Sequence, residues 1–376
     1  MGVDRPKSRV ALLAVTNLGF AYLVSPWPQL ATLLGFILGS WLLLQVAGST
    51  APARRAQGWF RLALVLPVLL LFLVHKLHTD WVALATANGS GHGVPGVLSV
   101  ITFLGLAYAF MRYSHVAIDI CEENLAPPGL IEYTAYVQPW FMALVGPIER
   151  LQQFRASVAT PSPIDRLTIA TSLERVCRGL AKTVLVHWAL EGYPQLALHG
   201  WSEPLILANL LLVGLYLDFS GYCDIAVGLG RLCGWAPPEN FAQPWRSRNL
   251  VELWNRWHIS LSQWSRDYVF TPLLRPLTRR RLPPLARAAI AYTCSMLVLG
   301  LWHEIAWPFV LFGLVHGAGL WLCKAWEVVI RRRFGNTGLQ RYLSLRPIRV
   351  LAMLITWQFV AFTLLLVRGS LWQQLR

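Results

Sequence analysis

The sequence has few charged residues, and acidic residues are the scarcest of them. Only 14% of its 376 residues are Asp, Glu, Lys or Arg, whereas a soluble domain carries about 25%. This shortage argues against a soluble globular protein, and the long apolar runs indicate an all-α polytopic transmembrane helix bundle. We expect residues 1–376 to form one transmembrane domain, because we find no internal repeat, low-complexity tract or soluble domain between the runs.

Cysteine is also scarce, and its spacing argues against two common uses. The six cysteines form no CxxC pair and lie mostly within apolar runs, so we expect small buried side chains and neither a disulfide framework nor a zinc site. No cluster has the spacing of metal ligands, and we expect no metal and no bound cofactor. The first apolar run reaches Pro26 without a clear cleavage site, so we do not expect a cleavable signal peptide.

The shortage of acidic residues leaves a net charge of +15. The basic residues gather between apolar runs, notably in 54–61, 275–287 and 331–349. This is the pattern of cytoplasmic loops that orient a membrane protein and meet anionic lipid, and not that of a water-exposed face for nucleic acid. We therefore predict contact with membrane lipid, no nucleic-acid partner, and a cytoplasmic N-terminus.

Apolar runs of about 20 residues predict the membrane spans. The predicted spans are 9–25, 29–48, 57–75, 94–113, 131–147, 201–219, 286–302, 305–326 and 348–367. Residues 168–191 predict a further helix that carries four charges, and the short, glycine-rich stretch 221–234 predicts a broken or re-entrant piece. In total we expect about ten or eleven membrane-embedded helices.

Polar side chains concentrate in one segment, NLVELWNRWHISLSQWSRDYVF (249–270). At about 100° per residue, 249–267 sorts into an amphipathic helix with Trp and Leu on one face. Asn255, His258 and Ser262 lie on the other face. One interpretation is a helix in the membrane interface, anchored by arginines such as Arg266. The alternative is a functional imidazole with an amide and hydroxyls to orient it.

Two histidines occur in GLWHEIAWPFVLFGLVHG (300–317), a strongly apolar stretch. Ionisable residues at membrane depth are rare and face a partner or a cavity. His316 lies among glycines suited to close helix packing, so we interpret it as structural. His303, at the junction of two apolar runs and followed by Glu304, is the better catalytic candidate.

Two aspartates occur in LDFSGYCDIAVGLGRLCGW (217–235). Asp218 and Asp224 are about 240° apart on an unbroken helix, and Gly221 is a candidate break. One interpretation is a structural ion pair of an aspartate with Arg231 or with a loop arginine. The other is a polar wall along a substrate passage.

These clusters, in this order, resemble the membrane-bound O-acyltransferases. The similarity is strongest to the bacterial branch that includes the alginate O-acetylation membrane protein and the D-alanyl transfer protein of teichoic acid synthesis. Residues 105–317 carry it. The matching pieces are GLAYAFMRYSHVAIDI (105–120), LVGPIERLQQF (144–154), the aspartate stretch (217–235), NLVELWNRWHISLSQWSRDYVFTPL (249–273) and the two-histidine stretch (300–317).

The resemblance implies a helix bundle with a central funnel or tunnel and an O-acyltransferase activity. An acyl group, most commonly acetyl, would pass from a cytoplasmic thioester (acyl-CoA or an acyl carrier protein) to an extracytoplasmic exopolysaccharide of the cell envelope. His303, 45 residues after His258, takes the position of the family's invariant histidine, and His258 takes that of its second catalytic residue. We hypothesise that His303 is the general base and that His258 orients a reactant. The candidates for binding or orienting substrate are Asn255, Ser262, Asp218, Asp224, Glu304 and Arg266.

The resemblance also implies a place in the bacterial cytoplasmic (inner) membrane and three partners: a periplasmic acyltransferase of the SGNH type, an acyl carrier protein and a polysaccharide acceptor. Two residues depart from the pattern, because Glu304 replaces a glycine and Cys223 an expected serine. They leave the substrate open. The alternatives are transfer of D-alanyl or another acyl group to a teichoic-acid-like or lipid-linked acceptor, a scaffold subunit, and a non-enzymatic transporter or flippase.

Overall fold

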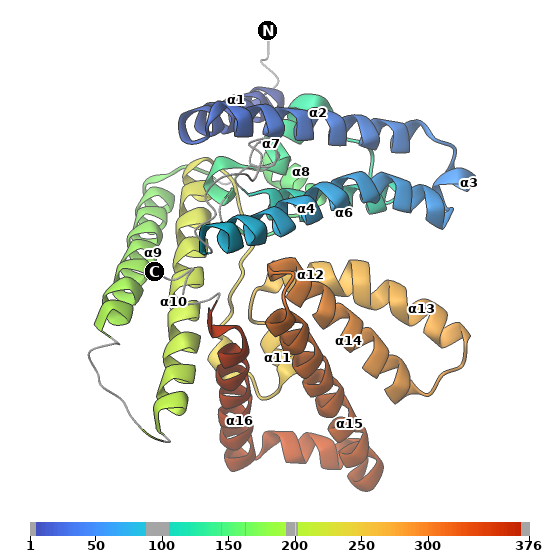
Figure 1. The fold of residues 1–376 in the computed structure, drawn as a ribbon, viewed down its shortest axis with the longest axis vertical. Helices are drawn as coiled ribbons and strands as arrows, with labels where there is room; N and C mark the ends of the chain where they lie inside the picture. The colour runs from blue at the N-terminus through green and yellow to red at the C-terminus, as the bar shows by residue number, and fades with distance from the viewer. Residues whose placement is uncertain are drawn as a thin grey trace. The chain divides into compact units, whose positions relative to one another are not determined.

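The computed structural model describes residues 5–87, 105–143, 145–161, 163–192, 200 and 202–369, and no β-strand occurs among them. The predicted all-α class is therefore confirmed (Figure 1). The chain divides into two compact units. They comprise Met1–Glu174 with Ala226–Pro238, and Arg175–Ile225 with Glu239–Arg376.

The first unit is built on the N-terminal helices, in which α1 packs against α7 and α4 against α6. Its elements are α1 (Arg5–Val24), α2 (Trp27–Ser49), α3 (Pro52–Arg55), α4 (Gly58–Ala87), α6 (Leu106–Cys121), α7 (Leu130–Val137), η1 (Trp140–Met142) and α8 (Leu151–Ala159).

Two long helices, α9 (Arg166–Gly192) and α10 (Ser202–Leu232), contribute residues to both units. The second unit continues with η3 (Pro244–Arg246), α11 (Leu250–Trp254), α12 (Ile259–Ser265), the π-helix η4 (Arg266–Phe270), α13 (Thr271–Arg279), α14 (Pro284–His303), α15 (Trp307–Ser344), α16 (Arg346–Leu364) and η5 (Leu365–Val367).

Within the described residues, six helices are long and apolar enough to cross a membrane, which confirms the multi-pass class. They are Trp27–Ser49, Gly58–Lys76, Ser202–Leu232, Pro284–His303, Trp307–Ser344 and Arg346–Val367. The predicted span 131–147 is wrong, because α7 ends at Val137. Pro139 follows, and it cannot donate a helical hydrogen bond. The predicted span 94–113 lies partly outside the described residues.

The predicted break at Gly221 is also wrong, because α10 runs unbroken from Ser202 to Leu232. The glycine serves helix packing instead. A Cβ atom on Gly221 would lie 2.9 Å from the carbonyl oxygen of Gly179 in α9. Small residues allow such close backbone approach between membrane helices. The glycine pair therefore sets where the side chains of α9 meet those of α10.

Helices α14 and α15 form an antiparallel hairpin with His303 at its turn. A Cβ on Gly313 would lie 2.8 Å from the carbonyl oxygen of Met296, and a Cβ on Gly317 would lie 2.7 Å from Cα of Thr293. The glycines of this stretch thus pack helices, as predicted. Because the helices are antiparallel, the basic stretches that precede α14 and end α15 lie at one end of the hairpin. His303 lies at the other end, about 30 Å away along α14.

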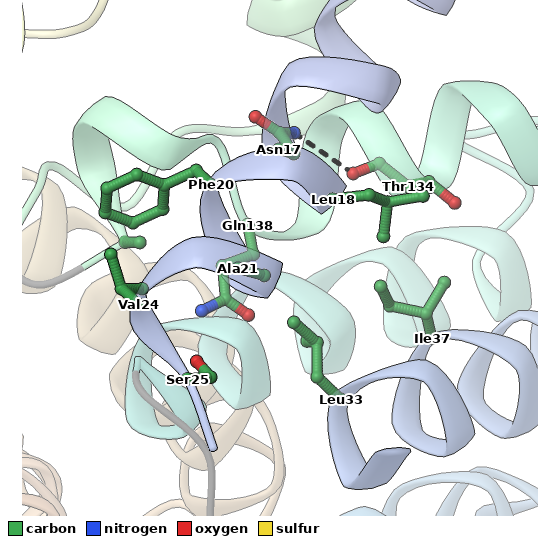
Figure 2. A pocket seen from close by; sticks show the side chains of 11 residues that line it. Asn17, Leu18, Phe20, Ala21, Val24, Ser25, Leu33, Ile37, Thr134 and Gln138 are labelled. Atoms are coloured by element: carbon green, nitrogen blue, oxygen red, sulfur yellow. Dashed lines mark hydrogen bonds between the residues drawn. The ribbon is translucent and has the colours of Figure 1, made fainter. Parts of the chain in front are cut away.

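Asn17 joins α1 to the end of α7 in the first unit. Its side-chain nitrogen donates to the carbonyl oxygens of Thr134 (3.2 Å) and Ala135 (3.0 Å), and its oxygen accepts from the N–H of Trp140 (3.0 Å). Figure 2 shows Asn17 in the wall of a pocket of about 20 Å³. This volume holds about one water molecule, so we interpret the pocket as a gap in packing and not as a substrate site.

A buried polar network lies at the loop that precedes α8. The guanidinium of Arg112 donates to the carbonyl oxygens of Val137 (3.1 Å) and Pro147 (3.0 Å). The indole N–H of Trp235 donates to the Glu149 carboxyl group, at 3.0 and 3.1 Å from its two oxygens. Burial raises the pKa of Glu149 to about 8, although the bond from Trp235 and the charge of Arg112 act to lower it.

Glu149 should make the stability of the fold depend on pH. Its proton stabilises the fold fully below the unfolded pKa, near 4.5, and this contribution is lost as pH rises towards about 8. We expect the free energy of unfolding of Glu149→Gln, relative to wild type, to increase by on the order of 3 kcal/mol between pH 5 and pH 9. Thermal unfolding in detergent at several pH values measures this difference.

Glu132→Gln is the matched control, because Glu132 is a partly exposed carboxylate paired with Arg155 at 2.6 Å. Parallel pH profiles for Glu149→Gln and wild type would show that Glu149 does not hold a proton in the folded protein.

Candidate functional site

His258 lies at a break in the chain and not within a helix. Helix α11 ends at Trp254 and α12 begins at Ile259, and His258 adopts left-handed backbone angles (φ 44°, ψ 54°) between them. The predicted continuous helix over 249–267 is therefore wrong. The polar face predicted around His258 does not exist as one helical surface.

A distant loop holds this break in place. The backbone carbonyl oxygen of Asn240 accepts from the N–H of Ile259 (3.0 Å), and the Asn240 side-chain oxygen accepts from the N–H (3.1 Å) and hydroxyl (2.7 Å) of Ser260. These are the first N–H groups of α12, which need partners from outside their own helix. Asn240 thus caps α12 in place of a local residue, and helical periodicity contains no signal for it.

The imidazole of His258 is buried among aromatic rings. His258 is only 3% exposed. Its ring centroid lies 4.7 Å from that of Phe219 and 6.3 Å from that of Trp302. Neither ring nitrogen has a hydrogen-bond partner among the described residues. Burial, and then the nearby His303, lower the pKa of His258 well below its usual value, so the ring is neutral at physiological pH.

His303 is the last residue of α14 and is exposed. Its ring lies 4.8 Å from Trp302 and 6.2 Å from Phe309, between ring centroids. It is close enough to His258 to shift the pKa of that residue. The fold therefore brings together the two histidines that the sequence singled out. One is buried and neutral, the other is accessible, and Trp302 contacts both.

The polar neighbours of His258 in sequence do not bond to its ring. The hydroxyl of Ser262 donates to the carbonyl oxygen of Trp257 (3.3 Å), and Asn255 is the C-cap residue of α11. Because the described residues leave both nitrogens of His258 without partners, ring packing and the left-handed backbone orient the imidazole.

Asp224 lies in a cluster of cations from α9. Its carboxylate is 2.9 Å from Arg175, 2.7 Å from Lys182 and 3.5 Å from Arg178. Arg175 also bonds Glu239 at 2.5 Å. The ion-pair interpretation of Asp224 therefore fits the contacts. The sequence predicted Arg231 or a loop arginine as the partner, whereas the structure gives three cations of helix α9.

Three other candidates occupy separate positions. Asp218 is half-buried on α10, close enough to His187 of α9 for their charges to interact. Glu304 ends α14 directly after His303 and is half-buried, while exposed Arg266 bonds its neighbour Asp267 at 3.2 Å. None of these contacts assigns a role in binding.

His316 packs between helices, as predicted. It is 1% exposed, its Nε2 lies 3.0 Å from the hydroxyl of Thr363, and its ring lies 4.1 Å from that of Phe312. Of the six cysteines, only Cys121 and Cys223 are buried, so the expectation for the others is wrong. Among the described residues, no group of three or more His, Cys, Asp or Glu is placed to hold a metal ion.

The fold and the site define a multi-pass helical membrane protein with two neighbouring histidines, one of them buried among aromatic rings. A sequence model of the membrane-bound O-acyltransferase family matches residues 53–367, most of the chain. The protein belongs to this family and is an O-acyltransferase.

Several curated proteins are similar to this chain along most of its length. A teichoic acid D-alanyltransferase of Streptococcus thermophilus is 29% identical over 74% of this chain and 71% of its own length. A probable alginate O-acetylase of Azotobacter vinelandii is 29% identical over 78% of this chain and 58% of its own length. A peptidoglycan O-acetyltransferase of Helicobacter pylori is 28% identical over 71% of this chain and 52% of its own length.

Proposed function

We propose that this protein moves an acetyl group from a cytoplasmic thioester across the bacterial inner membrane, for O-acylation of an extracytoplasmic cell-envelope polysaccharide. The observation that carries the proposal is the pair of His258 and His303, with a neutral, buried imidazole beside an accessible one. The names of the alginate and peptidoglycan relatives support the acetyl group and a polysaccharide acceptor.

The proposed chemistry needs a base for a poor nucleophile. A hydroxyl group attacks the thioester carbonyl while His303 takes its proton, and a tetrahedral intermediate forms. The intermediate then collapses to an ester, the C–S bond breaks, and His303 returns the proton to the leaving sulfur. His258, as a neutral ring, offers one N–H donor and one nitrogen acceptor, so it can orient a reactant without a charge.

A second acyl group is favoured by one specific observation. The two teichoic acid D-alanyltransferases match this chain over 71% and 83% of their own lengths, against 58% for the alginate relative from Azotobacter vinelandii. D-Alanine carried as a thioester on an acyl carrier protein is therefore the alternative donor, with a teichoic-acid-like or lipid-linked acceptor. A periplasmic acyltransferase of the SGNH type is the proposed partner where the acyl group is passed on rather than transferred directly.

Reconstitution in liposomes tests the function. We expect labelled acetyl from external acetyl-CoA to become covalently attached to an enclosed oligosaccharide acceptor, and a carrier-bound D-alanyl thioester serves as the parallel donor. Mass spectrometry of the acceptor identifies the ester. Entry of an acyl species without a new covalent bond would instead identify a transporter, and would overturn the proposed function.

A further inference from the structure

A large cavity lies within the second unit, at the start of α11 and between α15 and α16. Its volume is about 670 Å³, within the range of about 300–1,000 Å³ for ligand pockets. Apolar side chains and six charged ones line it. The charged side chains are Arg248, Glu252, Lys324, Glu327, Arg331 and Arg349.

The charges of this cavity do not cancel. Glu252 is bonded by Arg248, and Glu327 lies 3.0 Å from Lys324 and 2.6 Å from Arg331. Arg349 is an exposed basic side chain that lines the same cavity. Four basic side chains thus face two acidic ones, which leaves an excess of positive charge for an anion.

Some of the apolar side chains that line the cavity are also exposed at its edge. Leu322 is 58% exposed and Ile355 is 60% exposed, although both line the cavity. In a membrane protein, apolar side chains exposed at the edge of a groove meet lipid. The ligand class that fits this arrangement is therefore amphiphilic, with an anionic head and an apolar tail.

The surrounding chain places this cavity at the basic end of its unit. Gly335 interrupts α15 with left-handed φ 67°, and the turns that follow cross towards α16 (Figure 1). Residues 331–349 contain six arginines and no acidic residue, which the positive-inside rule assigns to the cytoplasmic side. Trp326 and Tyr342, whose side chains lie 3.2 Å apart, line the cavity as aromatic residues typical of the membrane interface.

We propose that this cavity binds an anionic phospholipid of the cytoplasmic leaflet. The phosphate group lies against Arg349 and the neighbouring cations, and one acyl chain follows Leu322 and Ile355. Basic pockets between transmembrane helices on this side bind such headgroups in other proteins. A soluble thioester donor would share the phosphate chemistry but would not need the exposed apolar edge, so a membrane lipid fits better.

Native mass spectrometry of the purified full-length chain tests this site. The protein is titrated with phosphatidylglycerol or with phosphatidylcholine of identical acyl chains. We expect preferential binding of phosphatidylglycerol, and a loss of about fivefold in that affinity for Arg349→Gln, since one such cation contributes about 1 kcal/mol. Arg346→Gln is the matched control, because Arg346 lies one turn earlier in α16 and does not line the cavity.

Three results would overturn the proposal. One is equal affinity for the two lipids, and another is an equal loss for Arg349→Gln and Arg346→Gln, which would indicate general charge attraction. The third is displacement of phosphatidylglycerol by coenzyme A, which would make the cavity a donor site. The measurement involves no catalysis, so its outcome is independent of the proposed acyl transfer.

Discussion

Replacement of His303 by alanine is expected to reduce the rate of acyl transfer by about 10²–10⁴-fold, the usual contribution of a general base. The side chain is exposed at the turn of the α14–α15 hairpin, so its loss should not disturb the core. Product acylation in reconstituted membranes measures the effect, with the amount of protein in the membrane determined in parallel.

His187→Ala is the matched control, because His187 is an exposed histidine on α9 and is not part of the proposed site. We expect this variant to retain activity. His258→Ala should lower the rate by less than His303→Ala, because its proposed role is to orient a reactant. Full acylation by well-expressed His303→Ala would remove His303 from the mechanism.

Replacement of Asp224 by alanine is expected to destabilise the fold by about 3–5 kcal/mol, because it leaves Lys182 without its carboxylate partner and Arg175 with only the more exposed Glu239. The side chains of Arg175 and Lys182 are only 13% and 21% exposed, and both lie within 3 Å of the carboxylate. Burial of an unpaired charge within an apolar environment costs more than the pair itself contributes. Thermal unfolding in detergent and the yield of folded protein measure the loss.

Glu239→Gln serves as the control, because it removes the other carboxylate that pairs with Arg175. Glu239 is 46% exposed, so we expect a change of about 0–1 kcal/mol. If Asp224→Ala instead keeps wild-type stability and loses acyl transfer, then Asp224 lines the substrate passage, as the second interpretation of the sequence holds.

Composition and apolar runs were sufficient to predict the class of protein. Low charge and runs of about 20 apolar residues indicate segments that cross a lipid bilayer. The backbone N–H and C=O groups of such a segment find their hydrogen-bond partners within a helix, so we predicted an all-α membrane protein. The order of the polar clusters also predicted the family. The predicted breaks were less reliable: Gly221 was expected to interrupt α10, but the close approach of Gly179 explains the glycine without a break.

The geometry around the histidines depended on contacts between distant residues. An amphipathic pattern assumes one continuous helix, whereas Asn240 bonds the first N–H groups of α12 and fixes His258 in a left-handed turn. In the other unit, Glu149 lies in one of the pieces that carry the family resemblance (144–154), and only the fold shows that it is a buried carboxyl group bonded by Trp235.

Thus the sequence alone determined the membrane class, through local hydrophobicity, and the family, through the motifs that carry the resemblance, and it singled out two histidines as the proposed catalytic pair. The tertiary structure decided which of the histidines is buried and neutral, what holds its backbone, and which cations surround Asp224. These properties depend on hydrogen bonds, burial and charges supplied by residues far away in the chain, and no local pattern records them.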